Sequence, residues 1–377
     1  MNFDQLVTLC NDTHQQLIVA ASRTVDTHLV ARNFLFGRYI VHFEQEGADR
    51  AHYGKQTLKA LSQALQATAG RGFSVDNLEL MRRFYLVFRA DILQAPSSET
   101  PLQPSIPDPS EKSETLSRIS SALRGTVLPS HELVRNLPQR FTLGWSHYVE
   151  LLTLADDGER RFYEIEATTN QWGVRELQRQ IASSLYQRLA LSRDPAGIRR
   201  LASAGQLIEK AADLIKDPVV LEFLGLADRP HYSEDDLESA IISQLESFLL
   251  ELGKGFLFEA RQKRFTFDND HFRVDLVFYN RLLRCYVLVD LKRDKLSHQD
   301  LGQMQMYVNY FDRHVKLPEE LPTIGILLCH RKNDALVELT LPADANIFAS
   351  KYQLYLPSKA ELIAQLARIT SQIEGQL

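Results

Sequence analysis

Two apolar segments in the C-terminal half carry one acid each, and a short turn separates them. Residues 272–279 contain Asp275, and residues 285–292 contain Asp290. Both segments are rich in β-branched and aromatic residues, and Asn280 begins the turn, so they predict two consecutive strands. Burying a carboxylate in an apolar strand is costly unless a cation meets it. The chain is therefore constrained to a sheet that brings two acids to one polar site.

Lys292 follows Asp290 by two residues, so both side chains point to the same face of the expected strand. Carboxylate oxygens bind Mg²⁺ or Mn²⁺, and a metal held in this way supports hydrolysis of a phosphodiester. We therefore expect a divalent-metal site in which Asp275 is the principal ligand and Asp290 the second. Lys292 would orient or deprotonate water and neutralise charge; the alternative is a simple ion pair with Asp290.

The spacing D-x14-D-x-K resembles the motif of the PD-(D/E)XK nuclease superfamily, with Val274 in the place of its proline. Downstream, Gln303 and Tyr307 form Q-x3-Y and share one helix face. The same pattern follows the lysine in several branches of that superfamily, so the resemblance makes both residues candidates for supporting the lysine and contacting the nucleic-acid backbone. The alternative is ordinary packing and surface hydrogen bonding on a helix.

The superfamily resemblance implies an α/β, restriction-endonuclease-like domain with a central mixed sheet. By the same resemblance, the carbonyl of Leu291 often completes the metal site. The sequence pattern predicts strands near 256–267, 272–280, 284–291, 323–329 and 351–356, and a helix near 298–313. A helix precedes these strands, because the apolar residues of 237–252 recur at helical period and Gly253 suits the position after its last turn.

The superfamily also places an acid on this preceding helix. Glu238, Glu246 and Glu251 are the candidates. We favour Glu238 as a third metal ligand, because it lies near the helix start, where the superfamily commonly has its first acid. Glu246 is the second choice, and Glu251, close to the helix end, could instead pair with a base. The expected catalytic set is therefore Asp275, Asp290, Lys292, Glu238, Gln303 and Tyr307.

Motifs in both halves extend the resemblance to most of the chain. They occupy residues 37–40, 53–54, 70–74, 81–85, 172–177, 248–256, 261–262, 275–279, 302–303 and 324–329. Together they resemble the bacterial YhcG-like family, whose members carry a C-terminal PD-(D/E)XK domain behind a helical N-terminal domain. One departure is Asp290, where the family more often has glutamate. Aspartate is shorter by a methylene, so the metal geometry could shift, but the superfamily admits either acid.

This resemblance implies a metal-dependent DNA endonuclease whose N-terminal half binds DNA or a protein partner. A homodimer is suggested by analogy, because cutting a duplex takes two cleavage events. Two alternatives remain open: a non-catalytic DNA-binding or regulatory protein that retains the nuclease fold, and an interaction scaffold. The preferred DNA structure and the biological pathway are open as well.

The organisation of the chain changes at a segment rich in proline. Five prolines between residues 96 and 109 alternate with serines and acids, which predicts a linker or exposed loop. We expect the following order: helical N-terminal domain, first part, 1–95; linker, 96–115; helical N-terminal domain, second part, 116–195; connector, 196–232; nuclease domain, 233–377.

Two parts of the N-terminal half carry features typical of nucleic-acid contact. A helix over 54–69, a glycine turn and a second helix capped by Asp76 with Glu79 are consistent with a helix-turn-helix, and equally with any helical hairpin. Residues 174–190 predict a basic amphipathic helix whose three arginines, Arg175, Arg179 and Arg188, could meet phosphates. The alternative for this helix is a salt-bridged surface.

Composition limits the remaining classes of function. The net charge of −5 over 377 residues means that any nucleic-acid surface must be a local basic patch. Three cysteines without a C-x-x-C argue against a disulfide framework or a zinc ribbon. Neither a basic N-terminal leader nor an apolar run long enough for a bilayer is evident, so we expect a cytoplasmic protein without a membrane partner.

Overall fold

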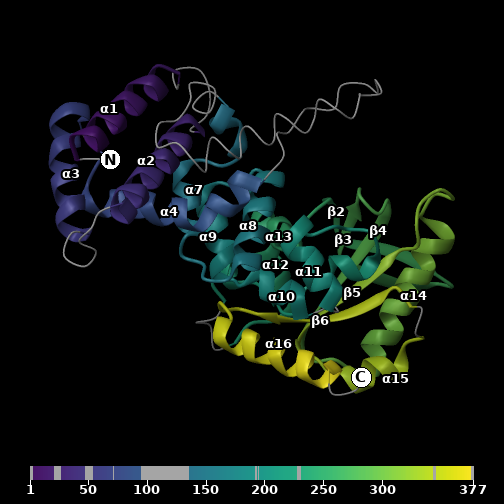
Figure 1. Cartoon of the computed structure of the whole chain (residues 1–377). Helices are drawn as coiled ribbons and strands as arrows, with labels where there is room; N and C mark the ends of the chain where they lie inside the picture. Colours follow the sequence, from purple (N-terminus) through teal and green to yellow (C-terminus); the bar gives the residue numbers. More distant parts are fainter. Residues whose placement is uncertain are drawn as a thin grey trace, which may run out of the picture. The chain divides into compact units, whose positions relative to one another are not determined.

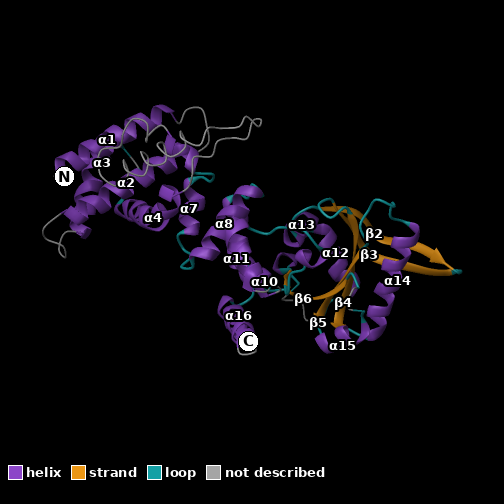
Figure 2. Cartoon of the chain, turned by 45° about the vertical axis from the view of Figure 1, so that its right-hand side comes forward, coloured by secondary structure: helices purple, strands orange, loops and turns teal. Residues whose placement is uncertain are grey.

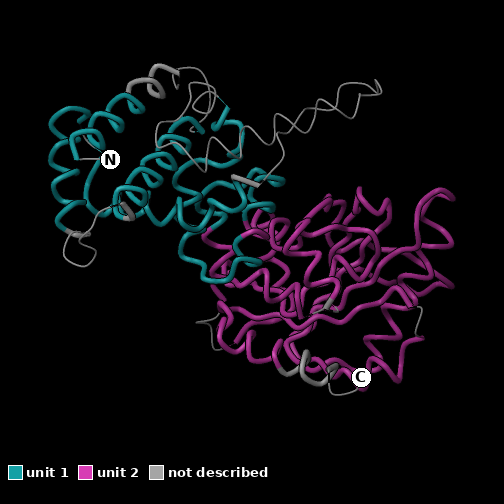
Figure 3. Tube along the Cα trace, viewed as in Figure 1, with its two compact units in different colours: residues 1–160, 164–177 teal, residues 161–163, 178–377 magenta. Residues whose placement is uncertain are grey.

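The computed structural model describes residues 3–20, 27–46, 54–70, 72–94, 136–191, 193, 195–226, 231–342 and 345–374 (Figure 1). The linker expected over 96–115 lies outside these residues, as does the start of the segment expected from 116. The chain divides into two compact units, one of residues 1–160 and 164–177, the other of residues 161–163 and 178–377 (Figure 3). Whether segments 1–195 and 233–377 fold independently stays a prediction.

The first unit, as expected, contains helices and no strand among the residues that the structure describes (Figure 2). Its helices are α1 (Phe3–Ala20), α2 (Thr27–Glu46), α3 (Gly54–Ala69), α4 (Val75–Gln94), the 3₁₀ turn η2 (Leu137–Arg140), α7 (Trp145–Leu151), most of α8 (Asp157–Thr169) and the start of α9 (Val174–Ala182). Helices α2 and α4 pack closely at Gly37, where a Cβ would come within 2.0 Å of the Met81 carbonyl oxygen. The backbones could not approach in this way around a larger residue.

The start of α4 differs from its expected capping. Ser74 is the capping residue, since its Oγ accepts from the backbone N–H of Asn77 at 3.2 Å, so the expectation of an Asp76 cap is wrong by two residues. Two arginines of α4 are held within the unit: Arg82 pairs with Glu44 at 2.9 Å, and Arg83 donates to the Leu152 carbonyl at 3.1 Å.

The second unit is built on one six-stranded mixed sheet, which confirms the expected α/β class. Its strands are β1 (Val219–Val220), β2 (Phe256–Phe267), β3 (Asp270–Asn280), β4 (Cys285–Lys295), β5 (Ile324–Arg331) and β6 (Ile347–Gln353). They lie in the order β1-β6-β5-β4-β3-β2; the β2–β3 and β3–β4 pairs are antiparallel and the others parallel. The last strand begins earlier than expected, because Ile347 starts its inward-facing pattern.

Helices cover both faces of this sheet (Figure 2). One face packs against α12 (Glu234–Ser243) and α13 (Leu245–Leu252), the other against α14 (His298–His314) and α15 (Asp334–Thr340). The unit also contains α10 (Leu185–Leu191), α11 (Pro195–Ala204), the 3₁₀ turns η3 (Ala211–Leu214) and η4 (Glu222–Leu224), and α16 (Lys359–Glu374). No helix in the described part of the chain is both long and apolar enough to cross a membrane.

Two helices that were expected to be continuous are each broken once. The helix over 237–252 is split at Gln244, and that over 174–190 is split near Ser184, whose φ is +54°. The second break turns Arg188 into the interior, where its Nη1 lies 2.5 Å from Glu251 Oε1. Arg179 pairs with Glu222 at 2.9 Å, so for Arg179 and Arg188 the ion-paired alternative holds rather than contact with phosphates.

Candidate active site

Asp275 and Asp290 lie side by side on adjacent antiparallel strands. The register pairs Leu276 of β3 with Val289 of β4, which places the two acids next to each other on the face that α14 covers. The Asp290 side chain is close enough to raise the pKa of Asp275, both by its charge and by hydrogen bonding. Asp275 Oδ2 also accepts from the backbone N–H of Leu291 at 2.8 Å. The Asp275–Asp290 pair, called the acid pair below, is therefore the polar site that the sequence required.

The acid pair is electrostatically unfavourable without a further cation. Burial, and then the adjacent charge of Asp290, raise the pKa of Asp275 to about 7, against the opposing effects of the Leu291 N–H and Lys292. The carboxyl of Asp275 therefore holds its proton more tightly than an isolated aspartate does. A divalent cation between them would let both ionise, so the donor set fits a hard metal ion.

Lys292 contacts the acid pair from the same strand. Its Nζ lies 2.8 Å from Asp290 Oδ2 and 3.9 Å from Asp300 Oδ1. Burial alone would lower the pKa of Lys292, but the charge of Asp290 and the hydrogen bond to it raise the pKa above its ordinary value. The amine is therefore protonated at neutral pH.

Asp300 is a neighbour of the site that sequence reasoning missed. It forms a capping box at the start of α14, in which Asp300 Oδ2 accepts from the Ser297 backbone N–H at 2.8 Å and Ser297 Oγ accepts from the Asp300 backbone N–H at 3.3 Å. The capping signature of serine followed three residues later by an acid could have located it. Through this box, the start of α14 is held beside Lys292.

Glu238 reaches the acid pair through Gln262. Glu238 is buried on α12 and accepts hydrogen bonds from Arg261 Nε and Gln262 Nε2. Gln262 Nε2 also donates to Asp275 Oδ1 at 3.1 Å. Gln262 is in strand β2 with a φ of +48°, a conformation unusual for a residue with a side chain. Its bonds to the two acids offset the cost of this conformation.

The other helical acids lie elsewhere. Glu251 is fully buried with Arg188, and its Oε1 also accepts from the backbone N–H of Val220 at 2.9 Å. Burial would raise the pKa of Glu251, but Arg188, Lys216 and Arg179 outweigh it and hold the pKa at about 2. Glu246 is exposed on α13, beyond the break in the helix.

Gln303 and Tyr307 share one face of α14, as expected, and bond to each other. Gln303 Nε2 donates to Tyr307 Oη, and the Tyr307 ring packs at 5.5 Å from that of Phe265. Burial raises the pKa of Tyr307, and the charges that act on it include Asp290 and Lys292. Tyr307 therefore borders the site from within the core.

Among the described residues, no group of three or more His, Cys, Asp or Glu side chains is arranged to hold a metal. The physical reason is that Gln262 lies between Glu238 and Asp275, while Arg261 pairs with the other oxygen of Glu238. The strand register brings Asp275 and Asp290 next to each other, whereas Glu238 is linked to Asp275 through Gln262. The roles of the six expected site residues stay predictions.

Comparisons with known proteins place the chain in a family. Residues 212–367 match the YhcG PDDEXK nuclease domain, and residues 10–107 and 116–188 match the DUF1016 N-terminal domain. A protein of Escherichia coli (strain K12) named "Putative nuclease YhcG" is 41% identical over 357 residues, which cover 93% of this chain and 90% of that protein.

A repair endonuclease from Pyrococcus abyssi is similar over 35% of this chain and 51% of its own, with 19% identity and a TM-score of 0.24, too low to carry an argument. The family assignment rests instead on the two matched domains and on the relative that is similar along nearly the whole chain. Together with the acid pair, they identify the chain as a member of the YhcG family, with a C-terminal PDDEXK nuclease domain and a DUF1016 N-terminal domain.

Proposed function

We propose that the chain is a metal-dependent endonuclease that hydrolyses phosphodiester bonds in DNA. The observation that carries this proposal is the acid pair, two carboxyls in contact beside a protonated lysine. Such a site is costly to a fold that gains nothing from it, because like charges are buried together. In a nuclease, the same site can bind a metal ion next to the phosphate of the substrate.

Asp275 and Asp290 would hold Mg²⁺ or Mn²⁺, with the Leu291 carbonyl as a further oxygen donor. A bound divalent ion lowers the pKa of water and neutralises charge on the phosphate. Glu238 contributes to this site once its hydrogen bonds to Arg261 and Gln262 rearrange.

Lys292 acts as a fixed cation. Because the pKa of Lys292 is raised, its ammonium donates hydrogen bonds to water or to a phosphate oxygen rather than removing a proton. Asp290 and Asp300 hold the ammonium from two sides. Gln303 and Tyr307 would support the lysine and contact the nucleic-acid backbone.

The helical N-terminal unit is assigned the binding of DNA or of a protein partner, and a second copy of the chain would supply the second cut of a duplex. We place the protein in the cytoplasm, where DNA and Mg²⁺ are both available. A non-catalytic DNA-binding protein or a scaffold would retain the same fold without cleaving.

A plasmid assay separates these functions. Supercoiled DNA is incubated with the full chain and Mg²⁺ or Mn²⁺, with and without EDTA. Nicking that EDTA abolishes supports the endonuclease. Binding without nicking by well-folded protein would favour the non-catalytic alternative, and neither binding nor nicking would favour the scaffold.

A further inference from the structure

A cavity of about 590 Å³ opens at the carboxyl ends of β5 and β6. We call it the β5–β6 pocket; the lining residues used below are Asp217, His330, Arg331, Lys332, Lys351 and Tyr355. In sheets with parallel strands, ligands bind outside the carboxyl ends of the strands. The pocket occupies that position next to the strand that carries Asp290 and Lys292.

The strand register joins the pocket to the acid pair. Lys292 of β4 is paired with Cys329 of β5, and Cys329 with Lys351 of β6, so the three residues form one row across the sheet. Because strands lie ~4.8 Å apart, the Cα atoms of Lys292 and Lys351 are separated by about 10 Å. Arg331 of β5 is paired with Lys295 of β4, three residues beyond Lys292.

Two cations of the pocket are available to an anion. Lys332 is neutralised, since its Nζ lies 3.1 Å from Asp217 and 2.9 Å from Asp334. Asp217 also accepts from the backbone N–H of Lys351 at 3.2 Å and so fixes the pocket wall. Arg331 and Lys351 are exposed, and within the described residues neither forms an ion pair. Their charges suit successive phosphates of one strand.

Aromatic side chains line the same pocket. Tyr355 is 60% exposed, which is unusual for a tyrosine, and His330 is exposed with its ring 5.8 Å from that of Tyr352. An aromatic ring beside cations is the arrangement that stacks nucleobases of single strands. Bases inside a duplex already stack on each other and do not present their faces to a pocket.

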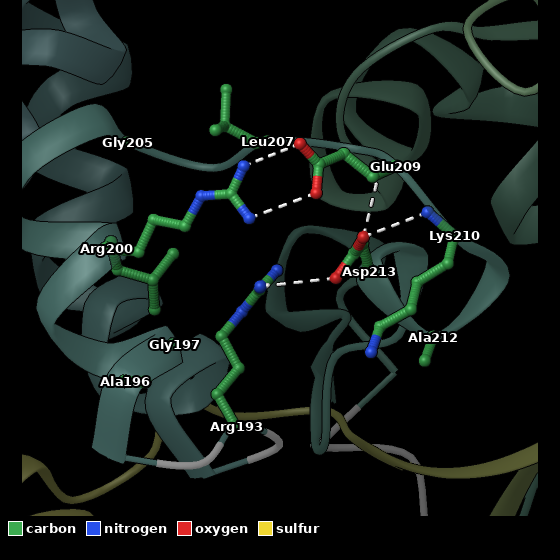
Figure 4. Close-up of a pocket in the computed structure, with 11 residues that line it drawn as sticks. Arg193, Ala196, Gly197, Arg200, Gly205, Leu207, Glu209, Lys210, Ala212 and Asp213 are labelled. Atoms are coloured by element: carbon green, nitrogen blue, oxygen red, sulfur yellow. Dashed lines mark hydrogen bonds and ion pairs between the residues drawn. The ribbon is translucent and has the colours of Figure 1, made fainter.

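Another cavity of this unit, of about 440 Å³, provides a contrast (Figure 4). It lies between α11 and η3, and the close-up shows its arginines directed at acids within the same cavity. Arg200 is 2.5 Å from Glu209, and Arg193 is 3.2 Å from Asp213. These arginine charges are already satisfied, and the cavity offers no aromatic ring to a base.

We propose that the β5–β6 pocket binds an unpaired nucleotide of the DNA strand that adjoins the scissile phosphate. Tyr355 stacks on the base, and Arg331 and Lys351 contact the phosphates. The inference rests on the proposed function and sharpens it, because it makes DNA with a single-stranded segment the preferred substrate.

The test measures binding of the full chain in EDTA, where no cleavage occurs, by fluorescence anisotropy. The probes are a single-stranded oligonucleotide, a blunt duplex, and a duplex with a single-stranded tail. The wild type should prefer the two probes with unpaired nucleotides. Tyr355→Ala should weaken binding of those probes by roughly tenfold, the order of one lost stacking contact, and leave the blunt duplex unchanged.

The double variant Arg331→Ala/Lys351→Ala should also weaken binding, with a different signature. The slope of log affinity against log salt on single strands should fall by about 1.4, because two phosphate contacts are lost. Tyr355→Ala should leave that slope unchanged. The matched control is Lys210→Ala/Arg313→Ala, which removes two exposed cations elsewhere in the unit, Lys210 from the cavity of Figure 4 and Arg313 from the far end of α14.

The outcomes separate this inference from the proposed function. Equal binding of all three probes, or equal losses in the pocket variant and the control, would overturn the pocket inference, while nicking with Mg²⁺ would keep the endonuclease. If Tyr355 is needed for binding single strands but no nicking occurs, the pocket inference is supported and the proposed endonuclease activity is contradicted. Absence of DNA binding in the wild type would overturn both.

Discussion

Two charged clusters of the second unit differ in how completely their charges are compensated. In the buried ion cluster of Arg188, Glu251, Lys216, Arg179 and Glu222, bases surround an acid and hold the pKa of Glu251 at about 2. In the acid pair, burial and a neighbouring acid raise the pKa of Asp275 to about 7. Burial alone would raise the pKa of both acids. The neighbouring charges therefore determine whether each pKa lies above or below its ordinary value.

This difference suggests a structural role for the buried ion cluster and a functional role for the acid pair. The buried ion cluster is complete within the protein, and its loss should cost stability. In the acid pair, Lys292 contacts Asp290 but does not offset the effect of burial and of the second carboxyl on Asp275, so the pair should cost stability. Removing a charge should therefore lower the stability of the fold in the buried ion cluster and raise it in the acid pair.

The largest expected effect is on catalysis. Asp275→Asn and Asp290→Asn should each reduce plasmid nicking to the level seen with EDTA, because each removes an anionic ligand at nearly constant shape. Thermal stability without metal should stay equal or rise, since a like-charge contact is lost. The matched control is Asp270→Asn, an exposed acid on the same strand as Asp275. Wild-type nicking by either site variant at unchanged stability would refute the site.

Lys292→Ala should lower the cleavage rate by roughly 10²- to 10³-fold, the effect of losing one fixed donor to developing charge. Metal binding, measured by calorimetric Mn²⁺ titration, should persist or tighten, because a competing cation is gone. Retained nicking together with a lowered melting temperature would instead make Lys292 a structural partner of Asp290.

In the buried ion cluster, Glu251→Gln should cost about 3–5 kcal/mol of unfolding free energy, because Arg188 keeps an uncompensated buried charge. Urea denaturation measures this loss. The double variant Arg188→Met/Glu251→Leu should be less destabilised than Glu251→Gln, since the buried charge of Arg188 is removed together with its closest acidic partner. A double variant as unstable as the sum of both single variants would indicate that packing, not charge, stabilises this region.

The pH dependence of stability should also distinguish the clusters. The pKa of Glu251 is about 2 in the folded chain against 4.5 ordinarily, so Glu251 stabilises the fold above about pH 4.5. This contribution, roughly 3 kcal/mol at 1.36 kcal/mol per pKa unit, is lost as the pH falls from 4.5 towards 2. Urea midpoints should therefore drop more steeply over that range for the wild type than for Glu251→Gln. Parallel curves would contradict the assignment.

The smallest expected effect is stabilisation by metal. Mn²⁺ or Mg²⁺ at about 100 times its dissociation constant adds ~2.7 kcal/mol, which raises the melting temperature by several degrees. EDTA should reverse the shift, and Asp275→Asn should lack it, whereas Glu251→Gln should retain it. An equal shift in Asp275→Asn would place the metal elsewhere.

Much of the second unit could be predicted from local pattern. The expected strand over 256–267 coincides with β2, and the helix near 298–313 with α14 to within one residue. Alternation and helical period report directly which side of an element is apolar. Because a strand also fixes which side chains share a face, the proximity of Asp290 to Lys292 followed from their spacing.

The sequence by itself determined the fold class and the acid pair with its lysine. Only the tertiary structure decided which helical glutamate lies beside that pair, and which arginines are exposed. The break at Gln244 separates Glu246 from Glu238, and the break at Ser184 buries Arg188 against Glu251. Gln262 joins Glu238 to Asp275 through a left-handed residue inside a strand. Periodicity describes one element at a time, whereas the charge state of a buried group depends on partners that distant segments supply.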